Sequence, residues 1–153
     1  MPVLINYCHA SSLPASVAGQ CEQLCKPNSE MQGLFNRIAS GDGATDSDLD
    51  VMVSYCATYP HHFEDDVLEV LGWATVSTWN DRLQLQAFVG EEHRKKGLGF
   101  SLIACLTFDM PEVKMPVAVF SDECKRIADR LDLNCEQWER KNNEWCLSTE
   151  VKG

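Results

Sequence analysis

The chain has 153 residues, a formal net charge of −10 at pH 7 and a sequence pI near 4.7. This length fits a single domain over residues 1–153, and the 44% apolar and 24% charged content is typical of a folded protein. The acidic balance argues against broad charge-driven binding to nucleic acid, and no apolar run approaches the roughly 18 residues that a membrane helix needs.

The first part of the chain predicts one strand, two helices and three further strands. Both helices begin at candidate serine N-caps, and a loop rich in Gly and Asp follows them. The next three segments alternate in polarity and are rich in β-branched and aromatic residues, and the last two meet at the turn "ND", which favours antiparallel pairing. The predicted ranges are strand 2–7, helices 12–25 and 29–40, loop 41–48, and strands 49–58, 67–79 and 82–89.

The second part predicts helix, strand, helix and a final pair of strands. Apolar residues recur at helical spacing over 97–108, and the short apolar run 115–120 is typical of a central strand covered on both faces. Ser121 is a candidate N-cap for the next helix, and "KNN" separates two strands within 136–151. The order β-α-α-β-β-β-α-β-α-β-β predicts an α/β (α+β) domain. Its sheet is mixed, mostly antiparallel, with six to seven strands and about four flanking helices.

The eight cysteines predict reduced structural thiols rather than a disulfide framework. The first residues, "MPVLINYCHASS", carry neither a basic start nor a long apolar core, so we expect a cytoplasmic protein. Cys21 and Cys25 would share one helix face, but no second pair or nearby histidine completes a zinc site, and no metal is expected.

Residues 94–99, "RKKGLG", follow the strand that ends at Val89 and open an apolar helix. A helix N-terminus carries partial positive charge and unpaired N–H groups, and it therefore favours phosphate. Gly97 and Gly99 would let the backbone approach an anion closely, and the three cations before them would add charge. The alternative is a solvated turn before a helix. A Rossmann fingerprint is excluded because its third glycine position is Leu102, and no P-loop sequence occurs.

At these residues the sequence resembles the GNAT superfamily of acyl-coenzyme A-dependent N-acyltransferases. The family signature is Gln or Arg, two residues, Gly, one residue, then Gly or Ala, and "RKKGLG" matches every fixed position. The flanks also resemble the family: 71–76 its third strand, 85–89 its fourth, and 117–133 its fifth strand with the following helix. The resemblance covers roughly residues 49–151. It implies a GNAT-like fold and direct transfer of an acetyl group from acetyl-CoA to an amine of a small molecule or protein.

The resemblance also implies which residues hold the cosubstrate. Main-chain N–H groups of the loop would bind the pyrophosphate, and a bulge in the fourth strand would part it from the fifth, so that the pantetheine arm pairs with the open edge. The amide of Val89 or Phe88 would polarise the thioester carbonyl; plain core packing is the other interpretation of both side chains. The implied cofactor-binding residues are Ala87, Phe88, Val89, Arg94, Lys95, Lys96, Gly97, Leu98, Gly99, Phe100 and Ser101.

The catalytic acid and base are less defined by the sequence. Many relatives carry a tyrosine after the fifth strand, where this chain has Ala128. Ser121 could protonate the departing thiolate instead, although it also suits an N-cap. Glu69 is a candidate base because an amine must lose a proton before it attacks. Further candidates, each also interpretable as a solvated group or as packing, are Glu64, Asp66, His61 and His62 for the base and Trp73 and Trp79 for an acceptor cleft.

Two functions therefore stay open at the level of sequence. The first is an N-acetyltransferase. The second is a coenzyme A-binding regulatory or interaction module with little turnover, which the departure at Ala128 favours. The net charge disfavours nucleic acid as a partner and would suit a cationic acceptor such as a polyamine or a lysine-rich peptide. The acceptor amine is not specified, and either a monomer or a homodimer is compatible with the sequence.

Overall fold

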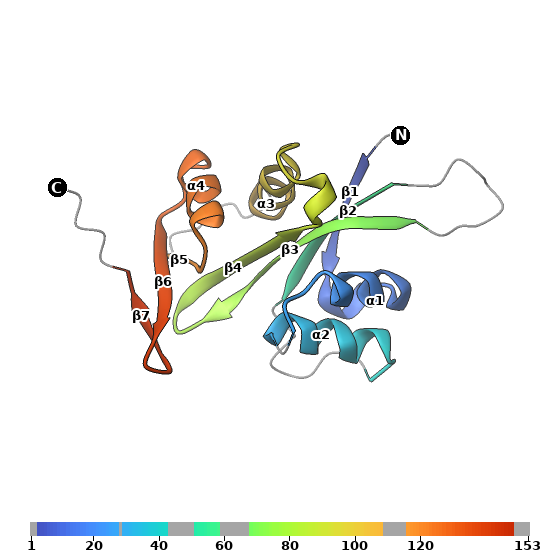
Figure 1. Cartoon of the computed structure of the whole chain (residues 1–153), viewed down its shortest axis with the longest axis horizontal. Coiled ribbons are helices and arrows are strands. Elements are labelled where there is room, and N and C mark those ends of the chain that lie inside the picture. The colour runs from blue at the N-terminus through green and yellow to red at the C-terminus, as the bar shows by residue number, and fades with distance from the viewer. Residues whose placement is uncertain (1–2, 28, 43–50, 59–67, 109–115, 149–153) are drawn as a thin grey trace.

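A computed structural model of the chain describes residues 3–27, 29–42, 51–58, 68–108 and 116–148. Within these ranges the predicted order of strands and helices is confirmed (Figure 1). The short 3-10 turns η1 (Ala10–Ser12) and η3 (Glu91–His93) lie between them. The elements are β1 (Val3–His9), α1 (Ala15–Gln23), α2 (Glu30–Ala39), β2 (Met52–Thr58), β3 (Glu69–Trp79), β4 (Arg82–Val89), α3 (Leu98–Phe108), β5 (Val117–Val119), α4 (Asp122–Arg130), β6 (Cys135–Lys141) and β7 (Glu144–Leu147).

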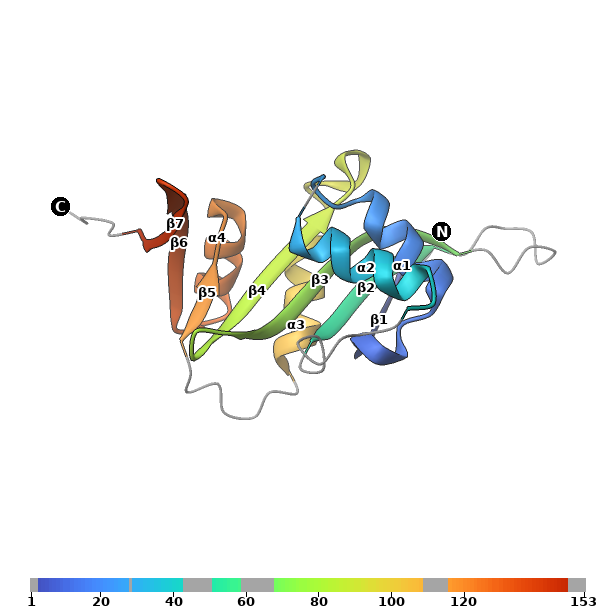
Figure 2. The ribbon, with the colours of Figure 1, turned by 90° about the horizontal axis from the view of Figure 1, so that it is seen from below.

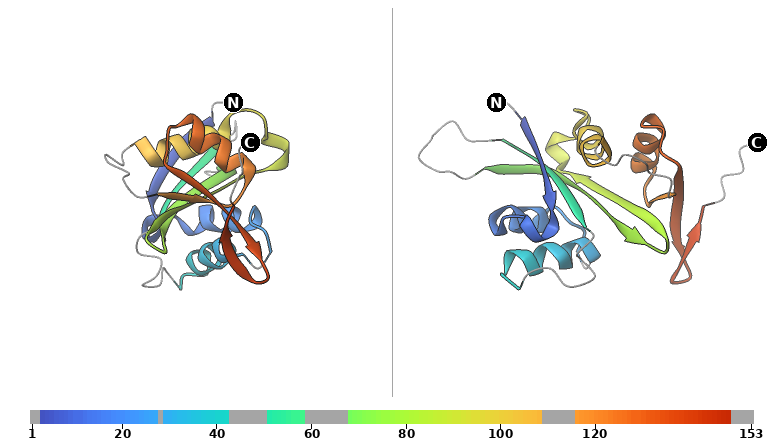
Figure 3. Two further views of the ribbon diagram at one scale, coloured as in Figure 1. Left: turned by 90° about the vertical axis from the view of Figure 1, so that its left-hand side faces the viewer. Right: turned by 180° about the vertical axis from the view of Figure 1, so that it is seen from behind.

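The strands form one seven-stranded sheet in sequence order, β1 to β7. Neighbours pair antiparallel except for β4–β5 and β5–β6, which are parallel, so the expected mixed and mostly antiparallel sheet is confirmed. Helices α1 and α2 cover one face, while α3 and α4 cover the other (Figures 1 and 3). This architecture is the α/β fold that the sequence predicts.

Each face of the sheet has its own apolar core. On the α1–α2 face, Phe35 packs edge-on against Trp73 with ring centroids 5.1 Å apart, and the Thr75 hydroxyl lies 3.3 Å from the Met31 sulfur. On the α3–α4 face the core includes Leu85, Leu102, Ile103, Val119 and Ala128, all fully buried. Since successive strand residues point to opposite faces, β4 contributes alternately to the two cores.

Local signals set most of the element boundaries. Ser29 and Ser121 cap α2 and α4, where their side chains accept hydrogen bonds from the Gln32 and Cys124 amides at 3.2 Å each. The prediction of a cap at Ser12 is wrong, because Ser12 belongs to η1 and α1 begins after Pro14, whose fixed φ suits a helix start. Two-residue turns with positive φ close the β3–β4 and β6–β7 hairpins at residues 80–81 and 142–143.

The parallel neighbours β4 and β5 touch only at one end. Leu83 pairs with Val117 and Gln84 with Ala118, and beyond these two pairs the strands separate (Figure 2). We call the unpaired stretch between residues 85–89 and the end of β5 the strand gap. It opens because β5 has only three residues and the chain then turns at Ser121 into α4.

The expected bulge in β4 is wrong. The β3–β4 register is continuous from Gly72 opposite Val89 to Trp79 opposite Arg82. The irregularity lies instead between β2 and β3, where Leu71 is an extra residue opposite the step from Cys56 to Ala57. The short β5, rather than a distortion of β4, therefore produces the strand gap.

Candidate functional site

A cavity of about 240 Å³ lies at the N-terminus of α3, at one end of the strand gap. We call it the α3 cavity. The end of β4, the following loop, the start of α3 and one side of α4 form its walls. Its lining residues are Val89, His93, Arg94, Lys95, Gly97, Leu98, Gly99, Phe100, Glu123, Arg126, Ile127 and Arg130.

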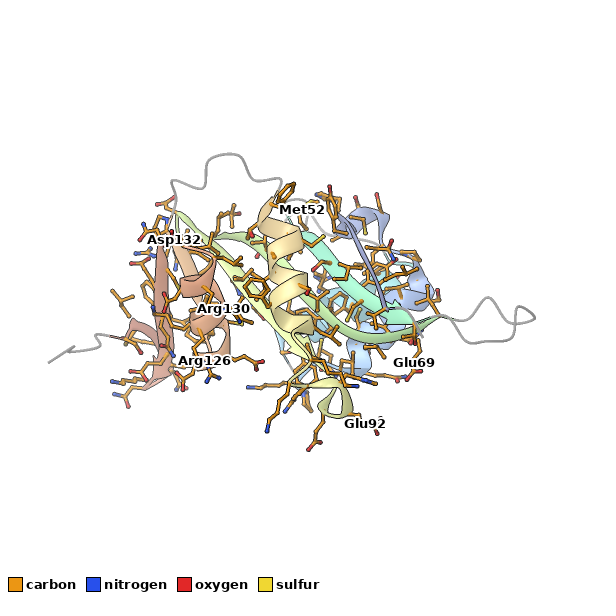
Figure 4. All side chains as sticks on the ribbon, turned by 90° about the horizontal axis from the view of Figure 1, so that it is seen from above. Met52, Glu69, Glu92, Arg126, Arg130 and Asp132 are labelled. Carbon is orange, nitrogen blue, oxygen red and sulfur yellow. The ribbon has the colours of Figure 1, made fainter. Side chains whose placement is uncertain are left out.

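The lining of the α3 cavity is cationic although the chain as a whole is acidic. Among the described lining residues, the cations are Arg94 and Lys95 from the loop and Arg126 and Arg130 from α4, and the carboxylate is that of Glu123. The two α4 arginines are four residues apart and therefore share a helix face beside α3 (Figure 4). The guanidinium of Arg130 lies 4.5 Å from the centre of the Phe100 ring. Such a lining favours a polyanion.

The loop before α3 presents its peptide N–H groups without internal acceptors. Lys95 and Gly97 have positive φ values of 67° and 76°. The first helical hydrogen bond runs from the Ser101 amide to the Gly97 carbonyl at 3.1 Å. Among the described residues, the N–H groups from Lys95 to Phe100 have no hydrogen-bond acceptor. Unpaired amides at a helix N-terminus form an anion-binding site, which agrees with the charges around them.

Hydrogen bonds at the two ends of β4 fix which of its peptide groups face the strand gap. The Gly90 amide donates to the Leu71 carbonyl at 2.8 Å, and the Leu83 amide donates to the Pro116 carbonyl at 3.0 Å. Because peptide groups alternate in direction along a strand, those of Ala87 and Val89 face the gap and that of Phe88 faces β3. The expectation that the Phe88 amide could point at a ligand in the gap is therefore wrong.

The Val89 carbonyl already has a hydrogen-bond donor within the protein. It accepts a hydrogen bond from Nε of Arg94 at 3.1 Å, and the same guanidinium lies 5.2 Å from the centre of the Phe88 ring. Arg94 is thereby held against β4, between the strand gap and the loop. The Val89 amide and the Ala87 peptide also face the gap, and the Ala87 main chain hydrogen-bonds to Cys124 across it.

A second cavity, of about 340 Å³, lies on the α1–α2 face. We call it the aromatic cavity. The start of α2, the middle of β3 and β4, the end of β5 and the β6–β7 hairpin surround it. Its lining residues are Lys26, Ser29, Glu30, Met31, Trp73, Trp79, Gln84, Leu85, Gln86, Ala87, Phe88, Phe120, Ser121, Cys124, Arg140 and Trp145.

The strand gap lies between the two cavities. Ala87 borders the aromatic cavity and Val89 the α3 cavity, two residues further along the same strand. Across the gap, Ser121 and Cys124 border the aromatic cavity. The pKa of the Cys124 thiol is raised, chiefly because the thiol is buried. Hydrogen bonds to Ser121 and to the Ala87 main chain lower this pKa by less than burial raises it. Two protic side chains, a hydroxyl and a protonated thiol, thus stand beside the Ala87 peptide.

The remaining residues that the sequence singled out lie outside the two cavities or outside the described residues. Lys96 and Ser101 belong to the loop and to α3, but neither borders the α3 cavity or the aromatic cavity. Glu69 is exposed at the first residue of β3, borders neither cavity, and lies across α3 from Arg126 and Arg130 (Figure 4). The other candidate bases lie outside the described residues, namely His61, His62, Glu64 and Asp66.

Several residues at the two cavities were not identified from the sequence. Arg126 and Arg130 follow the acids of the first turn of α4 and so complement the helix dipole, and their spacing of four residues is the signal that indicates a shared cationic face. Glu30 and Cys124 carried no recognisable signal, since one looks like an N-terminal helix acid and the other like a core residue. Gln84 was equally inconspicuous, as one polar residue of an alternating strand.

None of the eight cysteines forms a disulfide, and no group of three metal-ligating side chains occurs in the part of the chain that the structure describes. Within the described ranges, no helix has both the length and the apolar character to cross a bilayer.

Three solved structures illustrate what the chain is similar to. A candidate acetyltransferase of the GNAT family from Desulfovibrio desulfuricans superposes with a TM-score of 0.56 at 14% identity, covering 84% of this chain and 83% of its own. YncA from Salmonella typhimurium, a candidate acetyltransferase solved with its cofactor acetyl-CoA, gives 0.53 at 14% identity, covering 96% and 90%. An N-acetyltransferase from Staphylococcus aureus Mu50 gives 0.51 at 12% identity, covering 95% and 93%. No family sequence model and no curated protein sequence matches the chain.

These likenesses identify the fold. The seven-stranded mixed sheet with two helices on each face is the GNAT fold, as the resemblance at "RKKGLG" implied.

Proposed function

We propose that the protein is an acetyl-CoA-dependent N-acetyltransferase that transfers the acetyl group directly to an amine. The observation that carries this proposal is the relation between the α3 cavity and the strand gap. Unpaired amides and four cations collect at the phosphate-binding end, and an open strand edge leads from there to a second cavity on the opposite face. The GNAT fold of the chain supports the same assignment.

The charge and the hydrogen-bonding groups of acetyl-CoA suggest a position for each of its parts. The pyrophosphate belongs at the amides of residues 95–100, where Arg126 and Arg130 add charge-assisted contacts. The pantetheine arm, which carries amide groups, would pair with the peptide groups of Ala87 and Val89 as an added strand. Its acyl end then lies farthest from the phosphates, next to Ala87 and the aromatic cavity.

This placement changes the preferred oxyanion donor. Val89 borders the phosphate-binding cavity, whereas Ala87 borders the cavity that holds the protic groups. We therefore place the Ala87 amide, rather than that of Val89, against the thioester carbonyl, where a fixed N–H stabilises the charge that develops on oxygen. The Val89 amide would hold the pantetheine arm.

The proton transfers are assigned to the side chains that border the aromatic cavity. As the amine nitrogen bonds to the acetyl carbon and the C–S bond breaks, the departing sulfur must gain a proton and the amine must lose one. Ser121 lies at the gap and has a hydroxyl proton to donate, since its oxygen accepts from the Cys124 amide. Glu30 is the carboxylate at the cavity's lining, and it replaces Glu69 as the proposed base.

A binding titration and a thiol-release assay test the proposal together. Acetyl-CoA should bind the purified protein, and free thiol should appear only when an amine is added. Replacing Arg126 with Gln should weaken acetyl-CoA binding about tenfold or more, because a charge-assisted contact contributes roughly 1.5–3 kcal/mol. Lys125→Gln is the matched control, since Lys125 neighbours Arg126 and makes an ion pair with Asp129 away from both cavities. A wild-type protein that does not bind acetyl-CoA would refute the proposal.

A further inference from the structure

The aromatic cavity is walled by rings from segments far apart in the sequence. Trp79 ends β3, Phe120 follows β5 and Trp145 lies in β7. Their ring centroids are 5.6 Å apart for Trp79–Phe120, 6.3 Å for Trp79–Trp145 and 4.8 Å for Phe120–Trp145. Trp145 is also 44% exposed. These contacts hold a preformed apolar wall beside the strand gap.

Two polar groups on the floor of this cavity lack partners. Gln84 is only 8% exposed, and its side-chain amide has no hydrogen bond to another described residue. Trp73 is 4% exposed, and its Nε1–H is likewise unpaired within the described part of the chain. The Trp73 Nε1–H is fully buried, and an unpaired buried polar group costs roughly 1–3 kcal/mol, so this N–H points to a ligand that pairs with it. The Gln84 amide, which is not fully buried, offers a second donor and acceptor in the same lining. A hydroxyl can pair with both groups, because it both donates and accepts.

The charges that border the aromatic cavity disfavour a polycationic acceptor. Among the described lining residues, Lys26 and Arg140 outnumber the carboxylate of Glu30. A polyamine or a lysine-rich peptide, which the acidic composition had suggested, would meet two cations and one anion here. One ammonium group beside Glu30 matches the lining better. The volume of about 340 Å³ is at the lower end of the range for small-molecule sites, which favours a compact acceptor.

We propose that the acceptor is a small arylalkyl amine with a polar group on its ring. The ring packs against Trp79, Phe120 and Trp145, and its polar group reaches Gln84 and Trp73. The amine is held between Glu30 and the strand gap. This inference rests on the proposed acetyltransferase function and specifies the substrate class of the same site.

The test compares tyramine, 2-phenylethylamine, spermidine and a lysine-containing peptide in the thiol-release assay, with acetyl-CoA binding measured separately. Tyramine should have a kcat/KM at least about tenfold above spermidine and the peptide, and above 2-phenylethylamine, because a site built to pair a hydroxyl discriminates against its absence. Acetyl-CoA binding with preferred turnover of spermidine or the peptide, or with no turnover of either aromatic amine, would overturn this inference alone. Loss of acetyl-CoA binding would instead refute the acetyltransferase assignment.

Two substitutions in β7 test whether the aromatic rings bind the acceptor or only stabilise the fold. Trp145→Ala should lower kcat/KM for both aromatic amines about tenfold or more and leave acetyl-CoA affinity unchanged, whereas Leu147→Ala should change neither. Leu147 is a matched control because it lies on the same strand, is 42% exposed and borders neither cavity. Gln84→Leu should remove the preference for tyramine over 2-phenylethylamine. An unchanged preference in a folded Gln84→Leu protein would contradict the proposed pairing.

Discussion

Adding one methyl group at Gly99 tests the α3 cavity with little disturbance of the fold. A Cβ built at this residue lies 3.5 Å from Cδ1 of Ile127 and 3.8 Å from Cγ2 of Val89, which are ordinary van der Waals distances. Gly99 is in α3, where alanine is favoured over glycine by roughly 0.5–1 kcal/mol. We therefore expect Gly99→Ala to leave the free energy of unfolding unchanged or to raise it slightly.

The affinity for acetyl-CoA, in contrast, should fall in Gly99→Ala. The added methyl group stands between Val89 and Ile127, both of which line the α3 cavity, and so takes space that the cosubstrate needs. Overpacking of a fitted site costs about 1–3 kcal/mol, equivalent to a roughly 5- to 150-fold weaker affinity. Titration calorimetry with acetyl-CoA and urea unfolding measure the two effects. Full acetyl-CoA affinity in the folded variant would refute the role of this cavity.

Two matched glycine variants control this experiment. Gly19→Ala makes the same change in α1, where the new Cβ would lie 3.9 Å from the Ala39 Cβ and outside both cavities, so binding should not change. Gly97→Ala meets no atom within 4 Å, but its φ of +76° is left-handed and should cost roughly 1–2 kcal/mol of stability. Only Gly99→Ala should lower the affinity for acetyl-CoA without lowering the free energy of unfolding.

Two further predictions concern proton-bearing groups. Ser121→Ala should lose about 1 kcal/mol of stability with its helix cap, whereas Ser121→Asn keeps a capping side chain and hence the stability. Both should lower turnover if the hydroxyl donates the proton, and full turnover of Ser121→Asn would exclude that role. The second prediction concerns alkaline pH. Burial raises the pKa of Cys25 to about 12 and that of Cys56 and Cys135 to about 11. Above about pH 8.5 the unfolded thiols lose protons that the folded ones keep, so stability should fall as pH rises. A urea midpoint that is equal at pH 7.5 and pH 9.5 would contradict this.

The features that the sequence predicted correctly are encoded by neighbouring residues. The caps at Ser29 and Ser121, the hairpin turns and the Gly-x-Gly start of α3 each depend on a few adjacent residues, and backbone geometry alone constrains them. The order of elements followed for the same reason, because hydrophobic periodicity changes where a strand gives way to a helix.

The features that the sequence did not predict depend on residues distant along the chain. The apolar run 115–120 suggested a six-residue strand, but the described β5 has three residues, and this shortness opens the strand gap without a bulge in β4. The direction of each β4 peptide follows from hydrogen bonds to Leu71 and Pro116. No local pattern specifies either partner, and so the choice between the Phe88 and Val89 amides could not be made from the sequence.

The two cavities give independent evidence on the alternative of a coenzyme A-binding module without turnover. Such a module needs the cationic α3 cavity and the open edge of β4, but it gains nothing from an aromatic cavity across the gap. The Trp73 Nε1–H is buried there without a partner among the described residues, which costs stability unless a second ligand pairs with it. The absence of a tyrosine at Ala128 argues less strongly for that module, because two other protic groups border the same gap. Cys124 lies one turn before Ala128 in α4, and Ser121 is the N-cap of that helix. The unpaired floor of the aromatic cavity therefore favours an enzyme that binds an acceptor.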